Sequence, residues 1–261
     1  MKTLISISAL FLSLSLTAQT ANWYYNPTSG NGIQTNFSNS ASGSISIAMG
    51  LGTRASGQYS TAMGVETTAS GERSTAMGYS TAASGDYSTA VGLATKASDK
   101  SSLVVGQYNL LGSTVTNSAT EFSTENTALV IGNGTNSDNR SDALTVLFDG
   151  TTTIAGDLSI NSDARLKANI ISLGSTLAKL LQIDGKTYTM KKDDNKKQKI
   201  GVLAQDIEKV FPELVSESNG VKSVNYQGLV PVLINALKEQ DGKMKEQEAR
   251  IERLEKLLLD S

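Results

Sequence analysis

The chain has 261 residues, with 23 basic and 25 acidic side chains and a formal net charge of −2, and it contains neither histidine nor cysteine. The missing histidine and cysteine exclude Ser-His-Asp and Cys-His catalysis, disulfide bonds and most zinc sites made by side chains. The folded protein must therefore be held together by packing and by association between copies.

The first eighteen residues have the pattern of a secretory signal peptide, with Lys2, an apolar run at 4–14 and the small residue Ala18. The run is too short to persist as an anchor, so we expect no membrane span once the signal is removed. No cysteine follows it, which excludes a lipoprotein anchor. The sequence thus predicts an exported protein, secreted or held on a bacterial surface, that begins with an N-terminal segment at 19–41.

Residues 42–106 repeat with a period of 14. Glycine occurs at two phases of the period, at Gly43, Gly57, Gly71 and Gly85 and again at Gly50, Gly64, Gly78, Gly92 and Gly106. Such a period predicts stacked coils of two short strands and two turns. Each coil carries few apolar side chains, mainly alanine, methionine, valine and isoleucine, so we expect three columns to pack together. A monomeric solenoid and a disordered tract are the alternatives, and the regular phase argues against disorder.

The repeated triplet Ala-Ser-Gly at 55–57 and the quartet Thr-Ala-Met-Gly at 61–64 resemble the head repeats of trimeric autotransporter adhesins. This resemblance implies a left-handed parallel β-roll, assembled as a trimer. Such a head could bind a glycan or another cell-surface ligand, whose identity the sequence does not indicate.

Residues 107–161 are expected to form a neck and a β-rich connector, with strands at 129–134 and 142–150 joined by a polar loop. The Gly-Asn-Gly at 132–134 lacks the third glycine and the helix of a dinucleotide site. Asp138, Arg140 and Asp142 provide too few ligands for a calcium loop. Both features therefore predict plain turns, and neither a cofactor nor a metal is expected.

The composition changes at Ser162, since 15 of the 143 residues at 19–161 are charged but 32 of the 100 at 162–261. We take this change as a domain boundary. The lysine-rich stretch 191–199 is interrupted by Asp193 and Asp194, which favours a solvated hairpin loop over a nucleic-acid site. The remaining patterns predict a helix within 170–183, a strand at 186–190, a buried strand at 200–204, a short helix at 205–210 and an edge strand at 221–224.

The last helix has a heptad pattern, from which we assign residues 237–261 to a coiled coil. Its a positions are Val230, Leu237, Met244, Ile251 and Leu258, and its d positions are Leu233, Gln240, Gln247 and Leu254. The pattern predicts a seam of about four heptads. Glutamine at two d positions suits a three-stranded core, where it can hydrogen-bond around the axis.

Three motifs stand in order after the boundary: Ser-Asp-Ala-Arg-Leu-Lys at 162–167, Gly-Val-Leu-Ala-Gln-Asp-Ile-Glu-Lys-Val-Phe-Pro-Glu-Leu-Val at 201–215, and Val-Asn-Tyr at 224–226 leading into 233–240. Together they resemble the endosialidase-type intramolecular chaperone domain, peptidase family S74. The resemblance implies an α+β domain at 162–236 that promotes trimer assembly and cuts itself off between Asn161 and Ser162. It also implies that Ser162 is the nucleophile and Lys167 its base.

The residue types allow this chemistry independently of the resemblance. Without histidine and cysteine, a Ser-Lys pair is the main option left for nucleophilic catalysis. A lysine accepts a proton only in its neutral form, which burial or a nearby positive charge such as Arg165 would favour. Residues five apart do not meet on a regular helix, so a turn is required, and Asp163 is expected to position it. The alternative is that Ser162 and Asp163 merely cap a helix.

Two functions remain open from the sequence. One is a secreted trimeric fibre whose C-terminal domain drives assembly and then cleaves itself off in a single turnover. The other is a structural surface adhesin that keeps this domain as a trimerisation cap. No carboxylate pair or cofactor motif supports an enzyme that acts on external substrates.

Overall fold

The computed structural model describes residues 24–26, 32–34, 38–111, 119–191 and 196–259. Its contacts divide the chain into two compact units, with the boundary between Ile160 and Asn161, next to the change of composition. The predicted signal peptide at 1–18 and much of the segment at 19–41 lie outside the described residues.

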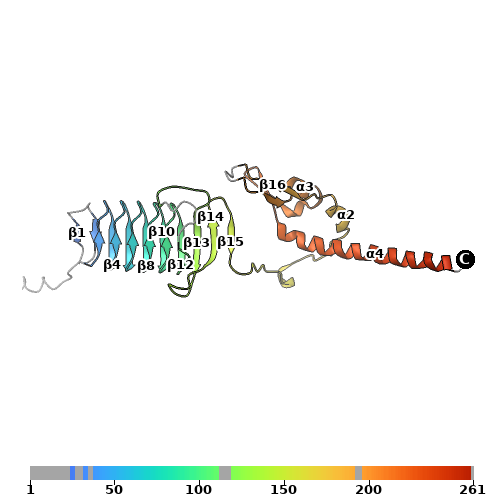
Figure 1. Ribbon diagram of the computed structural model, residues 1–261, viewed down its shortest axis with the longest axis horizontal. Coiled ribbons are helices and arrows are strands. Elements are labelled where there is room, and N and C mark those ends of the chain that lie inside the picture. The colour runs from blue at the N-terminus through green and yellow to red at the C-terminus, as the bar shows by residue number, and fades with distance from the viewer. Residues whose placement is uncertain (1–23, 27–31, 35–37, 112–118, 192–195, 260–261) are drawn as a thin grey trace, which may run out of the picture. The chain divides into compact units, whose positions relative to one another are not determined.

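The first unit is a β-solenoid of stacked coils, each with one longer and one shorter strand (Figure 1). The longer strands are β4 (Ile47–Leu51), β6 (Thr61–Val65), β8 (Thr75–Tyr79), β10 (Thr89–Leu93) and β12 (Leu103–Gln107). The shorter strands are β3 (Ser40–Ala41), β5 (Arg54–Ala55), β7 (Thr68–Ala69), β9 (Ala82–Ala83) and β11 (Lys96–Ala97). Each strand pairs in parallel with the strand 14 residues away, as Ala62 pairs with Ala76, which confirms the predicted coils.

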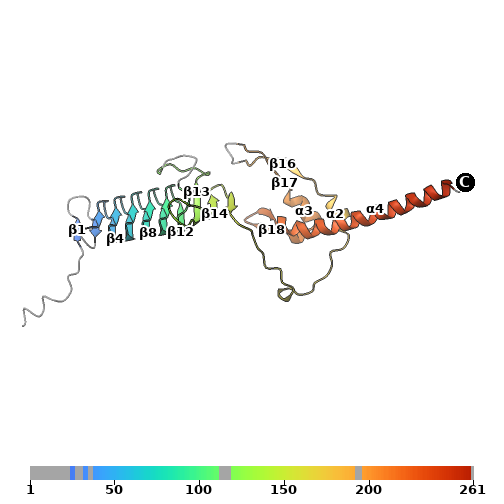
Figure 2. The same cartoon turned by 60° about the horizontal axis from the view of Figure 1, so that its bottom comes forward.

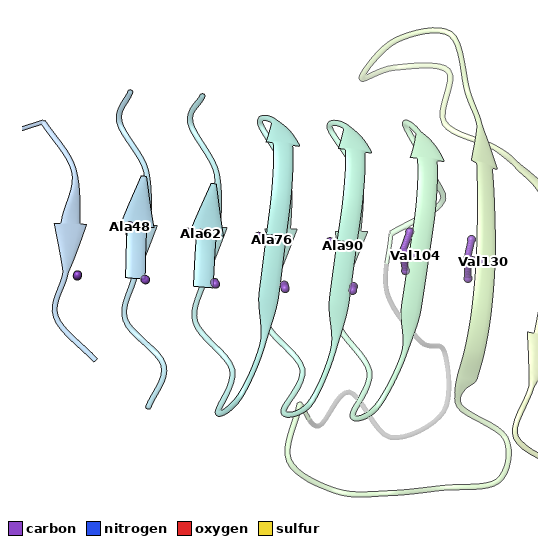
Figure 3. Close-up of a cluster of buried hydrophobic side chains, with 11 residues drawn as sticks. Ala48, Ala62, Ala76, Ala90, Val104 and Val130 are labelled. Carbon is purple, nitrogen blue, oxygen red and sulfur yellow. The ribbon is translucent and has the colours of Figure 1, made fainter. Parts of the chain in front are cut away.

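The core of the solenoid is a double column of small side chains between the two sheets. In Figure 3 one residue from each longer strand, and Val130 from the next strand of the same sheet, lie at the same height. Because side chains alternate along a strand, Ala62 is fully buried whereas its neighbours Thr61 and Met63 lie on the outer face. The buried residues are Ala41, Ala48, Ala55, Ala62, Ala69, Ala76, Ala83, Ala90, Ala97, Val104 and Val130.

A buried polar column follows one corner of the coils. Its inner members are Thr53, Thr67, Thr81 and Thr95, and asparagine occupies the same phase at both ends. Asn39 Oδ1 accepts the backbone N–H of Thr53 at 2.9 Å, and Asn109 Oδ1 accepts that of Lys96 at 2.8 Å. Asn109 thus supplies the acceptor that the backbone of the next coil provides elsewhere, as the Thr95 carbonyl does for the N–H of Ala82.

The repeated glycines allow the coils to approach closely. Gly78 has φ of 126°, and a Cβ there would lie 2.0 Å from the carbonyl oxygen of Gly92 in the next coil. Both the left-handed backbone and the lack of space therefore require glycine.

The longer sheet extends beyond the repeats at both ends. It begins with the antiparallel pair β1 (Tyr24–Asn26) and β2 (Gly32–Gln34). At its other end, β13 (Thr127–Asn133) pairs in parallel with β12, and β14 (Asp142–Leu147) and β15 (Thr152–Ile154) follow antiparallel. β13 and β14 agree with the two predicted strands, whereas β1, β2 and β15 are too short to have shown a pattern.

The second unit is small, α+β, and ends in a long helix. Its elements are η1 (Ala164–Leu166), α2 (Thr176–Leu180), β16 (Lys186–Tyr188), β17 (Lys199–Gly201), α3 (Ala204–Val210), η2 (Pro212–Leu214), β18 (Val215–Ser218), β19 (Val221–Val224), η3 (Tyr226–Gly228) and α4 (Leu229–Leu259). Figure 2 shows α3 and β18 near the first turns of α4. The core is made by Ile207 of α3, by Phe211 just after α3, and by Val232 of α4.

Two predicted elements of this unit are wrong in part. The helix expected within 170–183 is reduced to α2, because Gly174 and Ser175, with φ of 22°, break the chain direction before it. The strand expected to be buried at 200–204 ends at Gly201, and Ile200 is 82% exposed. The helix at 205–210 and the strand at 221–224 are confirmed by α3 and β19.

Two side chains of α4 hold the start of α2. The Glu239 carboxylate accepts the backbone N–H of Thr176 at 2.6 Å, its hydroxyl at 2.9 Å and the N–H of Leu177 at 3.2 Å. These bonds, led by the Thr176 N–H, lower the pKa of Glu239. Asn235 Nδ2 donates to the carbonyl oxygen of Leu173 at 3.2 Å. The clamp formed by Asn235 and Glu239 thus fixes residues 173–177.

We expect Gly78→Ala to destabilise the solenoid by at least about 2 kcal/mol, because the new methyl group meets the backbone of the next coil in a strained conformation. Urea unfolding followed by circular dichroism measures the change. Gly156→Ala is the matched control, since a Cβ at Gly156 would meet no atom within 4 Å. An unchanged unfolding midpoint for Gly78→Ala would contradict the close stacking of the coils.

We expect Glu239→Gln to weaken the packing of α2 on α4 near neutral pH. Because the pKa of Glu239 is lowered in the folded state, its contribution is present above the ordinary value of 4.5 and is lost as the pH falls through the lowered value. The hydrogen-exchange protection factors of the Thr176 and Leu177 amides, which correct for the slower intrinsic exchange at low pH, should therefore fall in wild type on acidification. In Glu239→Gln these protection factors should already be low at about pH 7. Glu246→Gln, at an exposed position of the same helix, should exchange like wild type.

Candidate functional site

The predicted cleavage site lies in an exposed stretch of chain. Residues 155–175 are all exposed, and η1 is the one regular element among them. Both Asn161 and Ser162 are accessible, so the peptide bond between them is not protected by packing within the described chain. A bond in such a stretch can change conformation at little cost to the fold.

A tight turn brings Ser162 and Lys167 together. The backbone N–H of Leu166 donates to the Asp163 carbonyl at 3.0 Å, and that of Lys167 donates to the Ala164 carbonyl at 3.1 Å. These bonds reverse the chain, so that Lys167 Nζ lies 2.7 Å from Ser162 Oγ. The geometry agrees with the expectation that a turn, and not a regular helix, is needed to join residues five apart.

Asp163 closes this turn and pairs with Arg165. Its carboxylate accepts the backbone N–H of Arg165 at 2.9 Å and the guanidinium Nη2 at 2.6 Å. The Arg165 side chain, and then its backbone N–H, lowers the pKa of Asp163, and the same contact raises the pKa of Arg165. Asp163 thus caps the short turn while Ser162 faces Lys167. Arg165, which the sequence suggested as a positive neighbour of Lys167, has its charge compensated by Asp163.

The Ser162–Lys167 contact can move a proton in either direction. An ammonium group on Lys167 donates to Ser162 Oγ, and a neutral amine would accept the hydroxyl proton at the same distance. The carbonyl carbon of Asn161 is the acyl group nearest to this hydroxyl along the chain. Both side chains are exposed in the single chain, and water stabilises the charged form of an amine. For Lys167 to accept the hydroxyl proton, water would therefore have to be excluded from the pair.

The other candidate residues help to close the end of the solenoid. Arg140 Nη1 donates to the carbonyl oxygens of Ala94 and Asn109 at 3.0 and 3.1 Å. Asp142 Oδ1 accepts the N–H of Leu110 at 2.9 Å, and burial raises the pKa of Asp142. Among the described residues, no three acidic side chains gather as they would around a metal ion. Within the same ranges, no helix has the length and apolar character to cross a membrane.

The clamp of Asn235 and Glu239 is the part of this region that the sequence did not predict. It joins α4 to residues about 62 positions earlier, and no spacing or motif links the two segments. The clamp fixes the chain six residues beyond Lys167, so it sets where the exposed stretch ends.

Two family models match separate parts of the chain. Residues 162–216 match the chaperone of endosialidase, Peptidase S74, and the match begins at Ser162. Two copies of the YadA head domain repeat match residues 55–81 and 83–109. The matched head repeats coincide with the stacked coils β5 to β12.

Two curated proteins are similar to part of the chain. The long tail fiber protein Gp37 of Salmonella phage S16 is 29% identical over 112 residues, which cover 39% of this chain and 15% of that protein. The long tail fiber protein Gp37 of Escherichia phage AR1 is 29% identical over 100 residues, which cover 35% of this chain and 9% of that protein. The chain thus spans a small fraction of either relative. Both matches to the head repeat thus lie in the first unit, and the match to the chaperone of endosialidase lies in the second.

Proposed function

We propose that this chain is an exported, homotrimeric, fibre-like protein whose C-terminal domain drives assembly and then cleaves itself off between Asn161 and Ser162. Ser162 acts as the nucleophile and Lys167 as the base, and Asp163 holds the turn that carries them. The observation that carries the proposal is the 2.7 Å contact between Ser162 Oγ and Lys167 Nζ, at the first residue of the chaperone match. The head remains as the fibre, available to a surface ligand.

The reaction is an acyl shift followed by hydrolysis. Ser162 Oγ bonds to the Asn161 carbonyl carbon while the hydroxyl proton passes to Lys167 Nζ. The C–N bond then breaks, Nζ returns the proton to the departing amine, and an ester joins Asn161 to Ser162 Oγ. Water attacks this ester and its C–O bond breaks, so the products are an Asn161 carboxylate and a chain beginning at Ser162.

The outer face of the solenoid supports self-association. On the longer strands and β13, half-buried or exposed apolar residues alternate with the buried alanines and valines and form an apolar column. Beside this column, Leu51 is 57% and Tyr79 is 52% exposed. A continuous apolar face of this kind marks an interface. The column consists of Met49, Met63, Met77, Val91, Val105 and Ile131.

The seam of α4 supports the same conclusion. Val232 and Ala236 are buried against the rest of the second unit, so the helix packs its own domain with one side. The a and d residues lie elsewhere and are exposed; Leu237, for example, is 69% exposed. An apolar seam facing water is stabilised when copies of the helix pack together.

Assembly would also supply what the Ser-Lys pair lacks. Leu166, Ile170 and Ile171, which surround Lys167 in sequence, are strongly exposed, with Ile171 at 86%. Apolar side chains in this stretch gain from being covered by another copy, and the cover would exclude water from Lys167. Cleavage is therefore expected to follow assembly.

The wild-type protein should yield two fragments that meet between Asn161 and Ser162, whereas Ser162→Ala should remain whole. Lys167→Ala should slow cleavage by about two to four orders of magnitude, because the base is lost. Lys167→Arg should be equally slow, since arginine keeps a positive hydrogen-bond donor but does not give up its proton. Intact mass spectrometry over time measures all four.

Uncleaved wild-type protein in the assembled state would show that the pair does not operate. The exposure of Ser162 and Lys167 would then favour the second function, a structural adhesin that keeps its C-terminal domain as a trimerisation cap. Equal cleavage in wild type and Lys167→Arg would instead remove Lys167 from the mechanism.

Met77→Glu should weaken assembly, because it places a carboxylate in the apolar column. Light scattering after size exclusion should show a shift from trimer towards monomer at equal concentration. Thr68→Glu, on the outer face of the shorter sheet, is the matched control and should leave the trimer unchanged. The same mass for both variants would exclude the longer-strand face as the interface.

A further inference from the structure

The charged residues beside the seam of α4 are sorted by sign. With Val230 at position a, the e positions of the middle heptads are acidic: Asp241, Glu248 and Glu255. The g positions of the first two of these heptads are basic, Lys243 and Arg250, and that of the third is Leu257. All five residues are exposed on α4. The two borders of the seam therefore carry opposite charge.

Much of this charge is not used within the chain. Asp241 pairs with Lys245 at 2.7 Å along the helix, and Lys243 lies near Glu239. Among the residues that the structure describes, Glu248, Arg250 and Glu255 take part in no salt bridge. Their charges are available to a partner at the edge of the seam.

The sorting distinguishes the two directions in which copies can pack. In a parallel, in-register coiled coil, each g residue faces the e residue of the following heptad in the neighbouring chain. Lys243 then meets Glu248 of a second copy, and Arg250 meets Glu255 of that copy, so both contacts join opposite charges. In an antiparallel pair, g faces g and e faces e, so Lys243 and Arg250 would oppose each other and the carboxylates would do the same.

We infer that α4 is an interface for identical copies of this chain, and that Lys243, Arg250, Glu248 and Glu255 select the parallel, in-register arrangement. The inference rests on the proposed self-association and adds the charged residues that favour its parallel, in-register packing. Exposed ion pairs add little affinity, but like charges placed face to face disfavour the wrong alignment. The apolar a and d residues provide the attraction, and the charged e and g residues determine the orientation.

The test uses the absence of cysteine from the chain. Ile251→Cys places one thiol at an a position, where parallel copies bring residue 251 against residue 251. In an antiparallel pair centred on the helix, residue 251 instead meets the region of residue 237. After mild oxidation of the full-length protein, a covalent dimer is expected on the fragment or chain that holds residue 251. Ala249→Cys, on the outward f position, should give none.

Charge variants in the Ile251→Cys background test the four residues. Lys243→Glu with Arg250→Glu makes both borders acidic, and Glu248→Lys with Glu255→Lys makes both basic. Each should lose the covalent dimer at low salt and regain it at high salt, because salt screens exposed charges. The variant with all four substitutions restores opposite charges and should cross-link like wild type. Mixing the two double variants should give dimers that contain one chain of each.

The possible results distinguish the role of the charges from the self-association itself. Cross-linking that is the same in all charge variants shows that the charges do not select the orientation. An assembled wild type in which Ile251→Cys gives no covalent dimer shows that the helices are not parallel and in register; the proposed self-association then stands without this inference. A wild type that is monomeric by light scattering overturns both.

Discussion

The structure of the first unit depends on a core that is only as wide as facing alanine side chains. Coils stacked in register leave no space for more, so glycine is required where backbones meet, as Gly78 and Gly92 do. A core this narrow removes little apolar surface from water for the number of residues that it orders. Larger apolar side chains, such as Met63, lie half-buried on the outer face, where the proposed association between copies would cover them. The same narrowness that fixes the coil thus directs it towards association.

In the second unit, the contact between Ser162 and Lys167 is made by local hydrogen bonds, whereas the surroundings of the pair depend on distant residues. Hydrogen bonds within six residues bring Ser162 to Lys167, so the turn forms in a single chain. The surroundings that would make a lysine act as a base are not local, because the residues next to the pair are exposed. In the proposed cleavage, such a separation would place Ser162 and Lys167 in position before water is excluded from them. A single chain would then not be cut before it has assembled with other copies.

The sequence predicted the repeated coils and the short turn, but not the contacts between residues far apart in the chain. The 14-residue period indicated the coils of the solenoid, since Ala62 has an equivalent residue one coil away. The Ser162–Lys167 turn followed from a short motif. The helix expected within 170–183 was wrong over most of its length, because Gly174 and Ser175 outweigh the apolar spacing. The hold of Glu239 on Thr176 could not be predicted, since it depends on how α4 packs across the domain.

The polar column that ends in Asn39 and Asn109 affects how the number of repeats encoded by the gene can change. Every coil between these two asparagines presents the same backbone groups to the coil before and after it. Duplication or loss of one repeat's codons would leave both end residues in place and would need no new packing. The length of the head can therefore be altered by recombination between repeats in a single event, without first passing through misfolded intermediates.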